Sequence, residues 1–105
     1  MRLKALLLRR DLKVKLNRIQ LIVSDVDGVL TNGQIICSDK ETEFKSFNVK
    51  DGMAVKLLQS IGIKIALISG ADSPATHFRA KSLAINECYT CIEDKCNKLE
   101  EIQNN

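Results

Sequence analysis

Apolar residues along this chain follow two kinds of spacing, and the alternation between them predicts an α/β fold. Three nearly continuous apolar runs are typical of buried strands, and they lie at 20–25, 63–68 and 84–90. Three other segments carry apolar residues at helical spacing, which predicts helices over 51–62, 73–83 and 92–102. Strands that alternate with helices through short loops indicate a parallel, Rossmann-like sheet with its ligand site at the carboxyl ends of the strands.

The helix over 51–62 has the clearest boundaries. Asp51 is its expected N-cap, and Gly62 is placed for the left-handed position that follows a helix end. The apolar stripe that would face the core consists of Val55, Leu58 and Ile61.

Two segments lie outside the strand–helix alternation. Within residues 1–18, leucines recur at helical spacing among basic side chains, which predicts a short basic amphipathic helix over 2–18. Within residues 33–48, two alternating stretches flank a polar turn at 39–41, which predicts a β-hairpin. An insertion directly after the first strand would form a flap over the carboxyl edge of the sheet.

Length and charge limit the classes of function. The 105 residues, 45% of them hydrophobic, are enough for one domain with a small core. The net charge of +3 comes mainly from residues 1–20, but the chain is only 4% aromatic and lacks the interleaved aromatics of nucleic-acid sites. The apolar stretch at 5–8 is too short for a signal peptide or a membrane span. We therefore expect a soluble, cytoplasmic protein that binds neither nucleic acid nor membranes.

The four cysteines raise the possibility of a metal site or of disulfides. Cys88 and Cys91 form a C-x-x-C pair, but a structural zinc site needs four ligands, and Cys96 with His77 would have to complete it without a second pair. With no secretory signal, stable disulfides are not expected either. We expect these residues, together with Cys37, to be small thiols that are buried or partly exposed.

The strongest chemical signal is the pair Asp25 and Asp27, which follows the first apolar run and precedes Gly28. Two carboxylates so close together repel each other and need a cation or a proton between them, and Mg²⁺ prefers such oxygen ligands. Asp25 could act as a carboxylate nucleophile that forms an aspartyl-phosphate, and Asp27 as the acid/base, provided that Asp27 already lies in the loop. The alternative is an acidic turn after a strand, with Asp27 and Gly28 as ordinary turn residues.

Three segments in order point to a known family. They are D-V-D-G-V-L-T at 25–31, L-I-S-G at 67–70 and D-K at 94–95. Together they resemble the first three motifs of the haloacid dehalogenase-type phosphatases. Within that superfamily, the segments 25–33, 47–53 and 65–85 most resemble the 3-deoxy-D-manno-octulosonate 8-phosphate (KDO 8-phosphate) phosphatases, and the similarity runs from about residue 10 to the C-terminus.

The resemblance implies roles for further residues. Asp25 and Asp27 would bind Mg²⁺, Ser69 with the backbone N–H groups after it, beginning at Gly70, would hold the phosphoryl group, and Lys95 would neutralise it. From sequence alone, Ser69 could equally cap a helix and Lys95 could form a helical salt bridge. Lys50 is assigned a contact to phosphate or to the substrate carboxylate.

The sequence departs from the family in two respects. Members often carry a basic residue directly after the Ser-Gly pair, where this chain has Ala71. The family's fourth motif, an acidic loop that supplies a Mg²⁺ ligand after a further strand, is missing, because the sequence reaches Asn105 before it. We therefore expect a partial haloacid dehalogenase-like domain over 1–105, with the strand that carries Asp25 at an open edge of the sheet.

Three functions remain open at this stage. The first is a Mg²⁺-dependent phosphomonoesterase that hydrolyses KDO 8-phosphate in lipopolysaccharide precursor synthesis. Enzymes of the resembled family are tetramers in which the hairpin completes a neighbour's pocket, so a homo-oligomer is expected. The second is an oligomerisation domain related to the C-terminal part of some acylneuraminate cytidylyltransferases. The third is an inactive fragment, in effect a basic interaction module.

Overall fold

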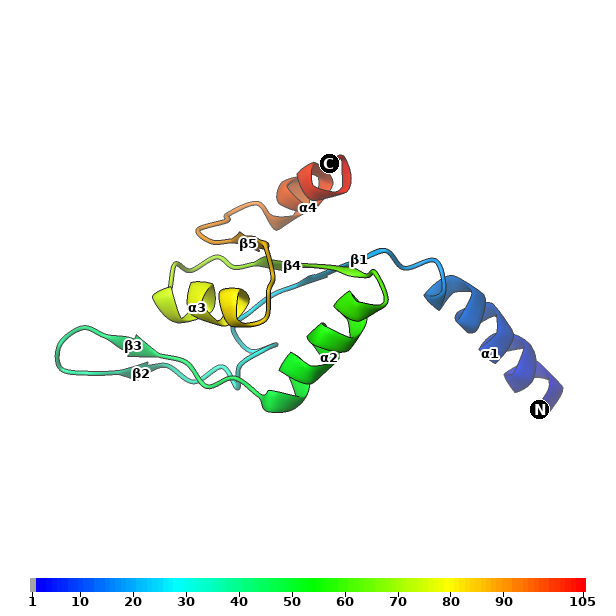
Figure 1. Ribbon diagram of the computed structural model, residues 1–105, viewed down its shortest axis with the longest axis horizontal. Helices are drawn as coiled ribbons and strands as arrows, with labels where there is room; N and C mark the ends of the chain where they lie inside the picture. The colour runs from blue at the N-terminus through cyan, green and yellow to red at the C-terminus, as the bar shows by residue number, and fades with distance from the viewer. Residues whose placement is uncertain (1) are drawn as a thin grey trace.

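The computed structural model describes residues 2–105 and confirms the α/β class. Its centre is a three-stranded parallel sheet in the order β1-β4-β5 (Figure 1). The strands of this sheet are β1 (Leu21–Ser24), β4 (Lys64–Ile68) and β5 (Glu87–Tyr89). The helices that pack on it are α2 (Val49–Ser60), α3 (Pro74–Ser82) and α4 (Lys95–Gln103).

β4 is the middle strand because its apolar residues are buried on both faces of the sheet. Ile65 and Leu67 face one side, where they form the first core cluster with Val55 of α2 and Ala80 of α3. Ala66 and Ile68 face the other side, where they form a second cluster with Ile102 of α4. A strand covered on both faces needs a continuous apolar run, and that run is the pattern that made β4 predictable.

β1 is an edge strand within the described part of the chain, as the sequence led us to expect. β1 pairs with β4 alone, from Leu21 opposite Lys64 to Ser24 opposite Leu67. On the face that α4 covers, a hollow of about 760 Å³ lies beside β1 and is lined by Leu21, Val23, Leu99 and other residues. The apolar face of β1 is therefore only partly covered in residues 2–105.

The N-terminus of α2 differs from the prediction. Asn48 is the N-cap, since its Oδ1 accepts a hydrogen bond of 2.8 Å from the N–H of Lys50. Asp51, the predicted cap, lies in the first helical turn instead. An Asn and an Asp three positions apart are both good caps, so the sequence pattern alone did not distinguish them.

The C-terminus of α2 confirms the role of Gly62. The N–H of Ile63 donates to the carbonyl of Leu58 at 3.0 Å, and the N–H of Gly62 donates to that of Gln59 at 3.0 Å, the two bonds of a Schellman motif. Gly62 has φ +88°, in the left-handed region. The prediction that Ile61 faces the core is wrong. Ile61 is the C-cap and is 73% exposed, because the chain reverses there and Ile63 packs inward instead.

α3 ends where the sequence predicted, but the last strand and helix are shorter than predicted. β5 covers only Glu87–Tyr89. Ala84 has a left-handed φ of 55° and turns the chain at the end of α3, so the strand begins later than predicted. α4 begins at Lys95 rather than near 92, since Asp94 is its N-cap and accepts a 3.0 Å hydrogen bond from the N–H of Asn97. Asp94 and Lys95 therefore open the helix directly after the third strand of the sheet.

Two elements project from this layered core (Figure 1). One is the basic helix α1 (Arg2–Leu16), whose leucines from Leu6 to Leu16 are exposed. The other is the hairpin of β2 (Ile36–Cys37) and β3 (Glu43–Phe44), which confirms the predicted hairpin with shorter strands; we call this hairpin the flap. None of the helices over residues 2–105 combines the length and the apolar content that crossing a bilayer requires.

All four cysteines are free thiols. Cys37, Cys91 and Cys96 are exposed, whereas Cys88 is half-buried against the first core cluster. Burial raises the pKa of the Cys88 thiol, which disfavours its thiolate form.

Gly62 provides a test of this fold. Replacing Gly62 by Ala should lower the free energy of unfolding by about 1 to 2 kcal/mol, because a Cβ is strained at a positive φ. Gly62→Asn should cost less, because Asn tolerates the left-handed region better. Urea denaturation of both variants measures the difference, and equal stability of Gly62→Ala and the parent would contradict the assigned C-cap.

Candidate active site

The site begins where β1 ends. Val26, the residue after Asp25, is fully buried, and its carbonyl accepts hydrogen bonds from the N–H groups of Val29, Leu30 and Thr31 at 2.9 to 3.3 Å. This tight turn carries Asp27 out of the strand and into the loop, which is the position that its proposed acid/base role requires. The Oδ1 of Asp25 accepts a 2.7 Å hydrogen bond from the N–H of Val26.

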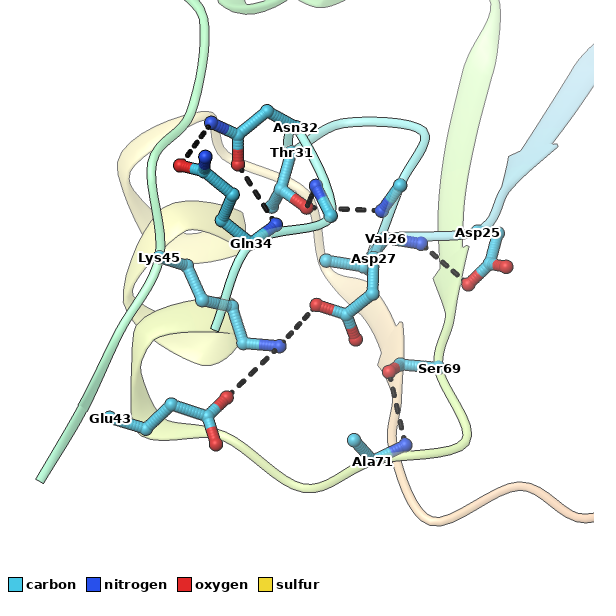
Figure 2. Close-up of polar contacts among 12 residues, drawn as sticks. Asp25, Val26, Asp27, Thr31, Asn32, Gln34, Glu43, Lys45, Ser69 and Ala71 are labelled. Atoms are coloured by element: carbon cyan, nitrogen blue, oxygen red, sulfur yellow. Dashed lines mark hydrogen bonds and ion pairs between the residues drawn. The ribbon is translucent and has the colours of Figure 1, made fainter. Parts of the chain in front are cut away.

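Thr31 organises the loop from its centre. Its buried Oγ1 accepts hydrogen bonds from the N–H groups of Gly28 at 3.1 Å and Gly33 at 3.2 Å. Both glycines have positive φ, so the loop needs them to curl around the threonine (Figure 2). We missed this role in the sequence, although a threonine between two glycines after the acidic pair was a usable signal.

Lys95 lies next to Asp25, as its place after the third strand of the sheet suggested. Its Nζ is 3.1 Å from the Oδ2 of Asp25, and both side chains are about half exposed. Lys95 is the first residue of α4, so the N-cap at Asp94 fixes the position of the Lys95 backbone. The contact is with Asp25 rather than with a neighbour on the same helix, which argues against the simple helical salt bridge.

Ser69 follows β4 at the same end of the sheet (Figure 2). It is almost fully buried, its N–H donates to the carbonyl of Tyr89 at 2.8 Å, and its carbonyl accepts from the N–H of Ile92 at 3.0 Å. Its Oγ accepts a 3.2 Å hydrogen bond from the N–H of Ala71. The N-cap of α3 is Ser73, so the alternative of Ser69 as a helix cap is wrong.

Gly70 and Lys50 are less closely tied to the aspartates. Gly70 is exposed in the loop after Ser69. Lys50 is exposed in the first turn of α2, and no ion pair or side-chain hydrogen bond of Lys50 occurs among residues 2–105. Their roles in substrate binding remain predictions.

The residue that sequence reasoning missed most clearly is Lys45. It follows β3 in the flap, and its ammonium forms an ion pair with Asp27 and lies 3.6 Å from the Oε1 of Glu43 (Figure 2). The alternation of the hairpin was a usable signal, because Lys45 and the half-buried Phe47 are two residues apart and would share a face.

Two features of the donor set bear on Mg²⁺. The carboxylates of Asp25 and Asp27 are 42% and 45% exposed, so hydrated cations can reach them, and their hard oxygens suit Mg²⁺. Each carboxylate can accept about four hydrogen bonds or metal contacts, so neither is saturated by its ammonium partner. In the part of the chain that the structure covers, however, no cluster of three or more His, Cys, Asp or Glu side chains could hold a metal ion. The residues present therefore fit Mg²⁺ as a partial ligand set.

Comparisons with known proteins agree with this geometry. No protein-family model matches the chain. The chain is 42% identical over 71 residues to 3-deoxy-D-manno-octulosonate 8-phosphate phosphatase KdsC of Haemophilus influenzae, which covers 68% of this chain and 39% of that protein.

Solved structures extend the similarity to the fold. The phosphatase of the same name from Moraxella catarrhalis, in complex with magnesium, phosphate and KDO, matches with a TM-score of 0.80 and 38% identity over 82% of this chain and 49% of its own. A Legionella pneumophila protein described as a HAD superfamily (subfamily III A) hydrolase matches with a TM-score of 0.80 and 31% identity over 90% of this chain and 56% of its own.

The similarity thus extends to both sequence and fold, over most of this chain. The chain spans between 39% and 56% of the length of these relatives. We conclude that it belongs to the haloacid dehalogenase (HAD) superfamily and is related there to the KDO 8-phosphate phosphatases.

Proposed function

We propose that this chain carries the nucleophile half of a Mg²⁺-dependent phosphomonoesterase that hydrolyses KDO 8-phosphate. The observation that carries the proposal is the pair of Asp25 and Lys95, which places a half-exposed carboxylate 3.1 Å from an ammonium at the carboxyl edge of the sheet. A carboxylate in that setting can attack phosphorus while the ammonium offsets the charge of the phosphoryl oxygens.

Hydrolysis would proceed in two displacements. An Oδ atom of Asp25 attacks phosphorus, the bond between phosphorus and the sugar oxygen breaks, and Asp27 gives its proton to that oxygen as the alcohol leaves. Water then attacks the phosphorus of the aspartyl-phosphate, Asp27 takes the proton back, and inorganic phosphate leaves with the Asp25 carboxylate restored. Asp27 fits this role because the turn at Val26 carries it into the loop beside the strand end.

The surrounding residues would orient the phosphoryl group. The buried Ser69 is fixed by backbone bonds to Tyr89 and Ile92, so its hydroxyl and the N–H groups after it have little freedom to move. Mg²⁺ would be held by the Asp25 carboxylate and the backbone carbonyl of Asp27, and when bound it would neutralise phosphoryl charge. Lys50, two residues after the flap returns to the core, would contact the phosphate or the sugar-acid carboxylate.

The substrate, location and assembly are also proposals. The KDO and phosphate in the Moraxella catarrhalis structure support a sugar-acid phosphate as the substrate and lipopolysaccharide precursor synthesis as the setting. We propose a cytoplasmic homo-oligomer, tetrameric as in the resembled family. The exposed apolar residues of the flap, Ile35, Ile36 and Phe44, support contact with a neighbouring subunit.

A second candidate is a non-catalytic oligomerisation domain, like that attached to some acylneuraminate cytidylyltransferases. The open edge of β1 and the projecting hairpin favour association with or without chemistry. The two candidates differ in whether phosphate is released from KDO 8-phosphate, which the next experiment measures.

The chain alone should be a poor catalyst, because Asp25 and the Asp27 carbonyl supply only two of the ligands that Mg²⁺ requires. Mixing it with a polypeptide that carries the family's fourth-motif segment should raise the rate of Mg²⁺-dependent phosphate release. The assay compares each polypeptide alone with the mixture, with and without Mg²⁺. If the isolated chain already turns over as fast as a full-length relative, an acidic residue such as Glu93 or Asp94 completes the metal site and the missing-ligand argument is wrong.

In whichever form is the more active, Asp25→Asn should abolish phosphate release, because an amide is a poor nucleophile and a weaker Mg²⁺ ligand. Asp27→Asn should lower kcat by about 10² to 10⁴ and leave KM nearly unchanged, since it removes proton transfer alone. Asp39→Asn, in the exposed hairpin turn, is the matched control. Full activity of Asp25→Asn would rule out the nucleophile assignment.

A further inference from the structure

Lys45 is an unusual lysine in this chain. Its side chain is only 4% exposed, although lysines are almost never fully buried unless they are paired. It belongs to the segment by which the flap returns from β3 to the core. Neither the sequence motifs nor the proposed reaction accounts for a buried ammonium at this position.

The partners of this ammonium identify what it does. Its Nζ donates to the Oδ1 of Asp27, and the Oε1 of Glu43 lies 3.6 Å away. Asp25 is paired separately with Lys95. Each aspartate is therefore paired with its own ammonium group, Asp25 with Lys95 and Asp27 with Lys45.

The backbone that follows Lys45 is fixed, which limits where its ammonium can lie. Phe47, two residues later, forms an antiparallel bridge with Thr31 and packs on the first core cluster. The guanidinium of Arg79 lies over the Phe47 ring, 5.5 Å from its centroid, and donates a 3.1 Å hydrogen bond to the carbonyl of Asn48. The stem of Lys45 lines a groove together with Phe47 and Pro74 at the start of α3.

We propose that Lys45 is a positioning residue that orients the Asp27 carboxylate for proton transfer. It holds Oδ1, and Oδ2 is left to exchange the proton with the leaving oxygen and with water. Because Lys45 belongs to the flap, the same contact ties the base of the flap to the loop that carries the acid/base. The inference rests on the proposed role of Asp27, but the contact itself can be tested independently of activity.

The first test uses the chain labelled with ¹³C in the aspartate carboxyl groups and studied by NMR at a single pH. The Asp27 signal is identified by its loss in Asp27→Asn. Lys45→Met should shift that signal and leave the Asp25 signal in place, Lys45→Arg should shift it less, and Lys40→Met, in the exposed hairpin turn, should leave it unchanged. An unchanged Asp27 signal in Lys45→Met would overturn the proposal.

The second test separates positioning from mere support of the flap. In the Mg²⁺-dependent phosphate-release assay, Lys45→Met should lower kcat about tenfold or more, within the loss expected from removing the acid/base, and leave KM within about twofold. Lys45→Arg should recover part of that loss. Adding Lys45→Met to Asp27→Asn should lower kcat little further, because both changes remove the same function.

In the activity assay, two outcomes contradict the proposal and two others bear on the proposed function alone. A rise in KM at unchanged kcat, or a full additional loss in the Asp27→Asn background, would show that Lys45 supports the flap without orienting Asp27. Phosphate release that is absent from every form, or undiminished in Asp25→Asn, would refute the proposed function. The NMR result would still decide whether Lys45 orients Asp27.

Discussion

Repulsion between two carboxylates is the constraint on which this end of the molecule depends. Asp25 and Asp27 follow β1 two residues apart, and carboxylates so close along the chain are stabilised by nearby positive charges. The fold supplies two, since Lys95 comes from the start of α4 and Lys45 from the flap. The ion pairs of the two aspartates thereby connect the end of the first strand, the last helix and the hairpin, which are distant in sequence.

The backbone also sets the two carboxylates in different local environments. The turn at Val26 and the threonine-centred loop around Gly28 and Gly33 separate a strand-end residue from a loop residue. In the reaction we propose, Asp25 would then face phosphorus while Asp27 faces the leaving oxygen. The neighbouring strand β4 supports this end of β1 rigidly, because both faces of β4 are packed. A loop that bears catalytic groups on such a scaffold keeps its geometry at little entropic cost.

Much of this arrangement could be predicted from sequence because it depends on local signals. Apolar runs marked β1 and β4, Gly62 marked the end of α2, and alternation marked the hairpin. The errors came where tertiary packing decided between equal local choices, as when Asn48 rather than Asp51 capped α2 and Ile61 turned outward. Lys45 was missed for a related reason: alternation places it on the same face as Phe47, but no local pattern identifies the distant carboxylate of Asp27 as its partner.

The central claim is that Asp25 forms the covalent bond to phosphorus. An aspartyl-phosphate can be trapped by rapid quenching during turnover of KDO 8-phosphate with Mg²⁺, reduced with borohydride to homoserine, and located by peptide mass spectrometry. The account predicts homoserine at position 25 only when substrate and Mg²⁺ are both present. Turnover without modification at this position, or modification at Asp27 instead, would contradict it.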